Sequence, residues 1–359
     1  MRAQIAAFCV SAVGGGTMFW RWRRIDEEDR RRVWELYGWF SGLMCVGSVF
    51  GAASWSLWMQ FIATYFASRS PGLSHAQMAP LFAYAEYWSA PFYVAYAIEI
   101  LCLSASKLMV LHRMMEFAMP KGDDVSRRWA VGGRVVMAAV VVGNVVGLCG
   151  NVVAAVFSKQ AGDAGSAAAV AFAANKTDAG TEFYRQGDRN IAFANDAASV
   201  QQFCEVTVLL IINLAFAVVG IASARRVSSA LPHVNDEQGA AGRQLRRQIV
   251  GTFAFVFVTF LLRAVFSTMN AVSSALQNDG AACDSKTSDL CSATCFNVYT
   301  LMQEWITFTP EFQLSIMLVS SPLATLVALW GMTSERTLEY MRSSGGELSA
   351  MMRVRMMRG

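Results

Sequence analysis

Long apolar stretches alternate with short polar segments along almost the whole chain. Most of the stretches hold at least the roughly 20 residues that a helix needs to cross a hydrocarbon core of about 30 Å. The longest interval between them, residues 158–202, is too short for a large soluble domain. The pattern therefore predicts an all-α polytopic transmembrane bundle of seven spans: Ala3–Trp20, Leu36–Phe66, Ala83–Leu111, Val131–Phe157, Phe203–Ala224, Ile249–Leu276 and Trp305–Trp330.

Basic residues gather in four of the polar segments. These segments hold 20 of the 30 lysines and arginines, whereas the segments on the other side of the spans hold seven. Cytoplasmic loops carry an excess of Lys and Arg, so we expect the N-terminus outside and the C-terminus inside. The segments assigned to the cytoplasm are 21–35, 112–130, 225–248 and 332–359.

The first predicted span is the weakest of the seven. Ala3–Trp20 is short and contains Gly14-Gly15-Gly16, which disfavours a helix. If it does not cross the membrane, six spans remain and both termini lie inside. With seven spans, residues 1–335 form the bundle, with an outer loop at 158–202, and residues 336–359 form a basic cytoplasmic juxtamembrane tail.

The composition supports a lipid bilayer as the principal partner. Hydrophobic residues make up 55% of the chain and charged residues only 16%, which is too apolar for an ordinary soluble domain. The formal charge of +4 comes from the basic inner segments, so it does not indicate a nucleic-acid partner. No retrieval signal stands at the C-terminus, and the plasma membrane is the default expectation.

Two features mark the outer side. Asn175-Lys176-Thr177 is an N-glycosylation sequon within the predicted outer loop. Four of the eight cysteines lie at or beyond the outer surface, where disulfides persist. We expect at least one disulfide in the loop 278–297, with a cysteine at the start of the fifth span as a further candidate partner. The candidates are Cys204, Cys283, Cys291 and Cys295, and their three pairings stay open.

Small residues recur at four-residue spacing in two spans. The second span contains Gly47-x-x-x-Gly51 and the fourth contains Gly143-x-x-x-Gly147. Such pairs allow helices to approach closely in a membrane. Tight contacts within one bundle are the plain interpretation, and a homodimer interface is the alternative.

Charged side chains at membrane depth usually face the interior of a bundle. Arg263 lies near the midpoint of the sixth span and Glu99 near the midpoint of the third, so equal depth predicts an ion pair between them. Asn270 extends the polar face of the sixth span, and Glu311 of the seventh span is a second candidate partner. A polar network that fixes helix neighbours and a ligand or ion site that opens outward both remain open.

In layout the chain resembles the G-protein-coupled receptors, although their signature motifs are absent. The inner end of the third span reads Leu111-His112-Arg113-Met114, which keeps the family's arginine without its acidic neighbour. The seventh span has Ser321-Pro322 where receptors carry an Asn-Pro motif. Residues 334–342 could form the short inner-surface helix that many receptors have. The resemblance implies a receptor-like or signalling protein that binds a small ligand in its polar core.

A cytosolic signalling partner would meet the inner segments. The segment 225–248 leads directly into the sixth span, so a shift of that helix would change how the segment is presented. Its basic face is the predicted partner surface and comprises Arg243, Arg246 and Arg247. A scaffolding role at the same surface is part of this interpretation.

The chain lacks the residue patterns of membrane enzymes. Its histidines, His75, His112 and His233, fall on opposite sides of the predicted bilayer and cannot converge on a zinc ion. A retinal protein would need a lysine in the seventh span, whereas the lysine within a span is Lys107 of the third. We expect no enzyme activity, no metal and no cofactor. A small-solute, ion or proton transporter that uses the intramembrane Glu and Arg residues is the alternative function.

Overall fold

The chain is all-α wherever its structure is described. The computed structural model describes residues 2–24, 35–118 and 123–230, and in the last third residues 251, 254–255, 257–259, 261–269, 271–272, 301–302 and 305. A shorter apolar helix covers Phe257–Met269. The long helices are α1 (Arg2–Arg23), α3 (Glu35–Ser68), α4 (His75–Ala118), α5 (Asp123–Ala173) and α6 (Thr177–Ala230).

Four of the described helices are long and apolar enough to cross a membrane. The qualifying stretches are Gly38–Ser68, His75–His112, Arg127–Ala173 and Thr177–Ala222. They cover all but two residues at an end of the second and fifth predicted spans and all of the third and fourth, so the prediction of an all-α chain with helices that can span a membrane is confirmed at this level. α1 is not one of the four, although its 22 residues give a helix of about 33 Å. The predicted seventh span lies outside the described residues except for Trp305.

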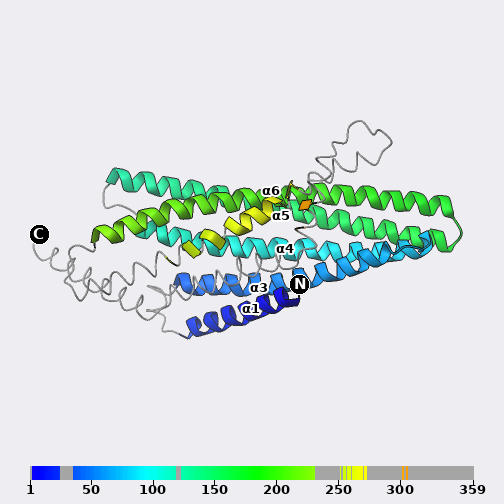
Figure 1. The fold of residues 1–359 in the computed structure, drawn as a ribbon, viewed down its shortest axis with the longest axis horizontal. Coiled ribbons are helices and arrows are strands. Elements are labelled where there is room, and N and C mark those ends of the chain that lie inside the picture. Colours follow the sequence, from blue (N-terminus) through cyan, green and yellow to red (C-terminus); the bar gives the residue numbers. More distant parts are fainter. Residues whose placement is uncertain are drawn as a thin grey trace, which may run out of the picture.

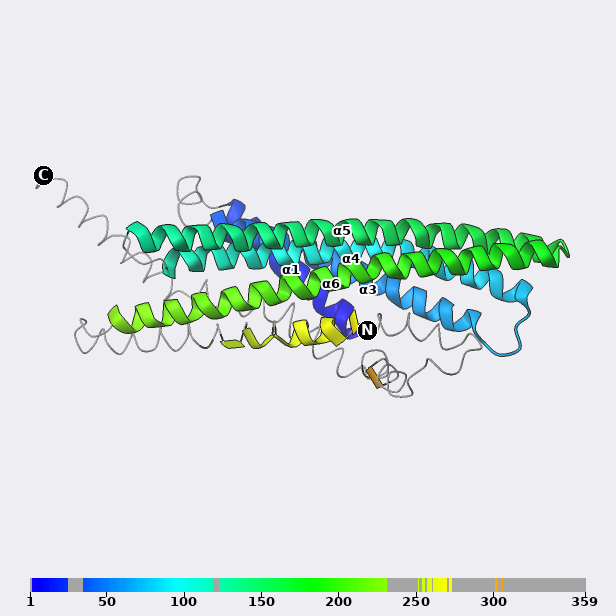
Figure 2. The ribbon, with the colours of Figure 1, turned by 90° about the horizontal axis from the view of Figure 1, so that it is seen from above.

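α5 and α6 are much longer than a bilayer requires. They contain 51 and 54 residues, which corresponds to about 77 and 81 Å of helix. They lie side by side and run the length of an elongated bundle (Figures 1 and 2). Residues 158–202, expected as an outer loop, are therefore almost entirely helical. We call residues 158–173 of α5 and 177–202 of α6 the stalk.

The stalk ends in a well-defined turn at residues 174–176. Lys176 N donates to Ala171 O over 2.9 Å and Asn175 N donates to Phe172 O over 3.1 Å. This is the Schellman arrangement, in which the residue after the helix adopts a left-handed conformation. Asn175 fills that position with φ 57°, and asparagine tolerates it better than most residues. The helical hairpin thus closes with local hydrogen bonds at its tip.

The turn between α3 and α4 lies at the same end of the bundle as the tip of the stalk (Figure 1). Gly72 supplies a positive φ of 90° there. Ser74 N donates to Gln77 Oε1 over 3.1 Å, while Gln77 N and Met78 N donate to Ser74 O. Ser-x-x-Gln is the sequence pattern of a capping box, and the bond from Ser74 N to the Gln77 side chain is one half of that arrangement. α4 therefore begins eight residues before the predicted span at Ala83. The beginning of α4 packs on the stalk, with Phe82 beside Tyr184 at a ring-centroid distance of 5.1 Å.

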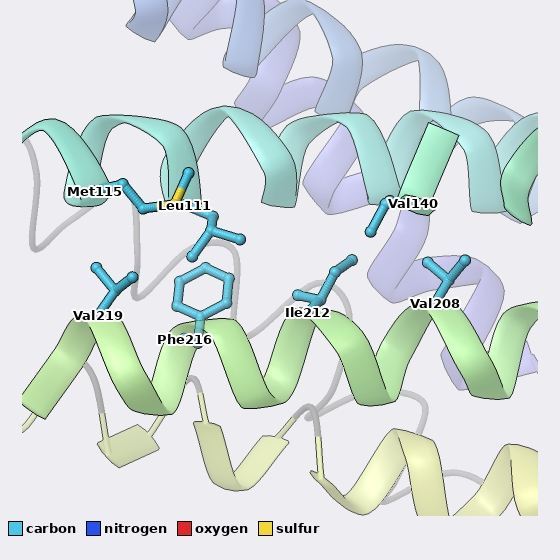
Figure 3. Close-up of a cluster of buried hydrophobic side chains, with 7 residues drawn as sticks. All are labelled: Leu111, Met115, Val140, Val208, Ile212, Phe216 and Val219. Atoms are coloured by element: carbon cyan, nitrogen blue, oxygen red, sulfur yellow. The ribbon is translucent and has the colours of Figure 1, made fainter. Parts of the chain in front are cut away.

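An apolar cluster holds α4, α5 and α6 together at the end of the bundle away from the stalk. α6 presents side chains at three- and four-residue spacing, the period of one helix face. They point toward Leu111 and Met115 of α4 and Val140 of α5 (Figure 3). The α6 members are Val208, Ile212, Phe216 and Val219.

α1 packs on α3 through its glycine run. A Cβ on Gly15 would lie 3.0 Å from both the Cys45 amide nitrogen and the Ser41 carbonyl oxygen, so only glycine allows this backbone approach. Phe8 in turn lies over Gly51. The glycines that weaken α1 as an isolated helix are thus the residues that seat it against α3.

The glycines in the middle of α5, Gly143, Gly147 and Gly150, face α6 of the same chain. A Cβ on Gly143 would lie 2.6 Å from Val208 Cγ2, and one on Gly150 would lie 2.8 Å from the carbonyl oxygen of Ala197. The opposite face of α5 is a surface of exposed valines, as expected of a helix in lipid. These valines are Val131, Val135, Val141, Val142, Val145, Val146, Val152, Val153 and Val156. Exposed Lys159 and Asp163 follow them on the stalk.

Candidate functional site

A buried ion pair joins α6 to the helix Phe257–Met269. Arg263 Nη2 lies 3.0 Å from Glu205 Oε1, and Arg263 Nε donates to the same oxygen over 3.2 Å. Both side chains are 4% exposed. Ser267, one turn after Arg263, also donates to Glu205 Oε1 over 3.0 Å. One carboxylate oxygen therefore receives three hydrogen bonds.

Tyr96 of α4 completes this arrangement. Its hydroxyl donates to the other carboxylate oxygen, Glu205 Oε2, over 2.8 Å, and accepts a bond from Arg263 Nη2 over 3.2 Å. We call Tyr96, Glu205, Arg263 and Ser267 the Arg263 cluster. It links α4, α6 and the helix Phe257–Met269, which lies along α6 (yellow in Figures 1 and 2).

The expected partner of Arg263 was Glu99, and that pairing is wrong. Glu99 is buried, as expected, but it lies on the side of α4 that faces α3, where Ser54 Oγ donates to its Oε2 over 2.9 Å. Tyr96 lies three residues earlier and faces α6. Three residues of helix turn the side chain by about 300°, which leaves the two directions about 60° apart, and this offset is enough for Tyr96 to meet α6 and Glu99 to meet α3. Equal depth was therefore an insufficient criterion, because the direction of each side chain decides which carboxylate Arg263 meets.

Sequence reasoning missed Glu205 because it stands only two residues inside the predicted fifth span. Its position was taken as the outer boundary, whereas α6 continues for 26 residues before Phe203. A signal was present in the sequence. Buried α6 residues recur at three- and four-residue spacing from the stalk into the apolar span, so this face is continuous across Glu205: Ala194, Ala198, Gln201, Glu205, Val208 and Ile212.

A small cavity adjoins the Arg263 cluster. Its volume is about 10 Å³, which is room for about one water molecule. Arg263 and Glu205 line it together with Ser104 and Lys107 of α4. Within the described ranges, no group of three or more His, Cys, Asp or Glu side chains is arranged to hold a metal ion. In this conformation the cluster is a packed polar network with space for a water molecule.

A second buried carboxyl, Glu86, lies nearer the stalk on α4. The hydroxyl of Ser158 in α5 lies beside its carboxyl. Ser158 Oγ is 3.4 Å from Ser89 Oγ, and the Ser89 hydroxyl lies beside that of Tyr93. We call these four residues the Glu86 group. Sequence analysis did not single them out, although Glu86, Ser89, Tyr93 and Tyr96 follow the three- and four-residue spacing of one α4 face.

Several predicted site residues fall outside the described part of the chain. Among the disulfide candidates, the structure describes Cys204 alone, and Cys204 is a free thiol. Its Cβ lies 3.4 Å from where a Cβ on Gly147 would stand, so it belongs to the α5–α6 contact. The residues outside the described ranges are Asn270, Glu311, Cys283, Cys291, Cys295, Arg243, Arg246 and Arg247, together with residues 336–359.

The sequon residue Asn175 lies at the tip of the stalk and is exposed. Helix α5 continues for 16 residues beyond Phe157, which places the tip about 24 Å past the end of the valine surface. The ring of Phe157 contacts that of Phe193 at 5.4 Å, so the same level on α6 is near Phe193.

A scan against family models, a search among curated proteins and a search among solved structures each found no match for this chain.

Proposed function

We propose that the chain is a receptor-like membrane protein in which the Arg263 cluster acts as a lock on the helix Phe257–Met269. The observation that carries this proposal is the buried Arg263–Glu205 ion pair with its Tyr96 and Ser267 partners. Breaking the pair would free this helix from α6 and α4. A signal that breaks or remakes the pair would thereby move the helix relative to the rest of the bundle.

Energetic considerations favour a switching role over a purely stabilising one. Two buried charges lose their hydration, and replacement of such a pair by apolar residues is often neutral or stabilising. A bundle that needed only cohesion could use apolar contacts like those around Phe216. The ion pair instead offers two discrete states, paired and unpaired, which is what a switch requires.

A movement of the locked helix could also be transmitted to the cytoplasmic side. We place the N-terminus outside, seven spans across the plasma membrane and the basic segment 225–248 in the cytoplasm. The described helix begins soon after this segment, so its movement would change how Arg243, Arg246 and Arg247 are presented to a cytosolic signalling partner. Charge distribution supports this orientation, and so does the exposed sequon at the tip of the stalk.

The test is hydrogen–deuterium exchange of the purified full chain in lipid nanodiscs. Glu205→Gln removes the charge while keeping the size of the side chain. We expect faster exchange in peptides covering 257–269 and 225–248, with unchanged exchange in α5 and in the stalk. The matched control is Glu182→Gln, because Glu182 pairs with Arg189 over 2.9 Å on the exposed surface of the same helix.

Two results would contradict the lock. Unchanged exchange in 257–269 would mean that the ion pair does not hold this helix. Faster exchange in all helices together would mean that the pair only supports the bundle as a whole.

Transport of protons or another small ion is the second candidate. It is favoured by the position of the water-sized cavity, which lies directly between Lys107, Glu205 and Arg263. Liposomes that contain the pure protein would then show a proton or ion flux that Arg263→Ala abolishes. Absence of flux from the wild-type protein would remove this candidate and leave the lock untouched.

A further inference from the structure

Glu86 is a buried carboxyl whose partners are hydroxyl groups. It is 5% exposed, and Ser158 and Ser89 beside it are 1% and 3% exposed. The Glu86 group extends from α4 to α5, since Ser158 lies beside Glu86 and its hydroxyl oxygen is 3.4 Å from that of Ser89. This differs from the Arg263 cluster, where a guanidinium neutralises the carboxylate.

The cations at this level of the bundle are engaged elsewhere. Lys159, next to Ser158 in sequence, lies 3.3 Å from Asp163 on the exposed face of α5. Arg69, next to the end of α3, interacts electrostatically with Asp188 of α6. Among the described residues, no salt bridge reaches Glu86. The titratable and charged groups around this level are Arg69 of α3, Tyr87 and Tyr93 of α4, Lys159 and Asp163 of α5, and Tyr184 and Asp188 of α6.

A buried carboxylate without a cation is costly, and binding a proton removes that cost. The Ser158 hydroxyl beside Glu86 suits either protonation state, because a hydroxyl can both donate and accept. It would donate a hydrogen bond to a carboxylate and accept one from a carboxylic acid. The surroundings of Glu86 can therefore accommodate the gain and loss of a proton without rearrangement of the helices.

Glu86 lies close to the polar stalk, so a proton from the water around the stalk has a short path to its carboxyl. Ser158 directly follows Phe157, where the run of exposed valines from Val131 to Val156 ends and exposed charged residues of the stalk begin. Glu86 thus lies at the level where the lipid-facing surface meets the polar one. The Arg263 cluster lies deeper, since Tyr96 is ten residues further along α4 and about 15 Å away along the helix axis.

We propose that Glu86 is a proton-binding site, at which a proton from the stalk side adds to the carboxylate and is held among Ser89, Tyr93 and Ser158. The step is a simple association, in which carboxylate and proton give a carboxylic acid. It goes beyond the lock at Arg263, and neither proposal requires the other.

Infrared difference spectroscopy of the full chain in lipid nanodiscs tests the site. Spectra are recorded between mildly acidic and mildly basic pH, and the signal is the C=O stretching band of a buried carboxylic acid. We expect this band in the wild-type protein and its loss in Glu86→Gln. Ser158→Ala should shift the band, because the carboxyl loses a hydrogen-bond partner. Glu182→Gln, which alters an exposed carboxyl, should leave it unchanged.

Each alternative outcome overturns the proposal. A band that survives Glu86→Gln and disappears in Glu99→Gln or Glu205→Gln would assign the proton to another carboxyl. No titrating band at all would mean that Glu86 does not exchange a proton in this pH range. A band that responds to sodium at constant pH would assign a cation to the site. If Glu86→Gln does not fold, the Ser158→Ala shift decides, and its absence counts against the site.

Discussion

At the scale of single residues, burial decides what a hydrogen bond contributes. α4 carries two tyrosines that each donate to a carboxylate over 2.8 Å: Tyr96 to Glu205 and Tyr87 to Asp163. The first bond lies inside the bundle and the second on the exposed stalk. Hydrogen bonds to charged groups are worth more where water cannot replace them. The two tyrosines therefore form a natural comparison within one helix.

We predict that Tyr96→Phe destabilises the protein by about 1.5–3 kcal/mol, the usual contribution of a hydrogen bond to a charged group. The substitution leaves Glu205 and Arg263 with one partner fewer in a place without bulk water. Tyr87→Phe is the control and should have little effect, because water takes over the bond to Asp163. Thermal unfolding of both variants in one detergent measures the difference. Equal losses would show that the Arg263 cluster is open to water.

At the scale of secondary-structure elements, the long α5–α6 hairpin depends on the closeness of its two helices. Small residues of both helices meet there, since Gly150 of α5 lies against Ala197 of α6 and Gly187 of α6 lies against Ala161 of α5. Buried small residues also follow one face of α5 at three- and four-residue spacing, and they are Ala154, Ser158, Ala161, Ala164, Ala168 and Ala171. Such faces let helix backbones approach closely, as in membrane helix pairs generally.

We predict that Gly150→Ala weakens the α5–α6 contact, because the new Cβ would lie 2.8 Å from the Ala197 carbonyl oxygen and backbone cannot move aside cheaply. The control is Gly132→Ala in the same helix, where no atom lies within 4 Å of the new Cβ. That change should be neutral or stabilise by up to about 1 kcal/mol, through helix propensity. Thermal unfolding separates the two, and a stable Gly150→Ala would indicate a looser contact than the structure has.

The sequence predicted the elements better than their ends. Leu36–Phe66 agrees closely with α3, because polar residues stand directly at both ends of its apolar run. The predicted span Phe203–Ala224 covers less than half of α6. Hydropathy identifies the apolar part of a helix that lies in lipid, but it does not detect a polar part of the same helix that continues into water. The stalk shows its helical nature through the spacing of its alanines, a periodicity that a search for apolar runs overlooks.

The candidate site was also predicted only in part. Depth along the spans correctly placed Arg263 and Glu99 inside the bundle. The pairing needed the direction of each side chain around its helix, and direction depends on how α4 is rotated between α3 and α6. That rotation follows from the packing of all helices together, as in the Gly47 contact with Cys102 of α4. A single sequence carries this information only weakly.

At the scale of the whole molecule, one end of the bundle is built for lipid and the other for water. α1 begins near the middle of the long axis, and the stalk with the start of α4 extends beyond it (Figure 1). The valine surface of α5 covers about 38 Å of helix. This exceeds a hydrocarbon core of about 30 Å, and tilting accommodates the difference.

We predict that Asn175 carries an N-linked glycan when the protein is made in a eukaryotic secretory pathway, because the stalk then lies on the lumenal side. Treatment with an endoglycosidase should increase gel mobility, and Asn175→Gln should have the faster mobility without treatment. The chain offers a matched control in the inner segment 225–248, where Glu237→Thr creates a second sequon at Asn235. That sequon should stay unmodified. Glycan at Asn235 and none at Asn175 would reverse the orientation.

The uninterrupted length of α5 and α6 makes the hairpin a lever. Each helix is a single rod from the Schellman turn to the far end of the apolar region. A rod of about 80 Å that pivots by about 5° around its centre moves each end by roughly 3.5 Å, in opposite directions. A glycan-binding protein or an antibody that grips the tip would exert torque on it. A force applied to the tip of the stalk would displace the opposite ends of α5 and α6, and no solute would need to enter the bundle.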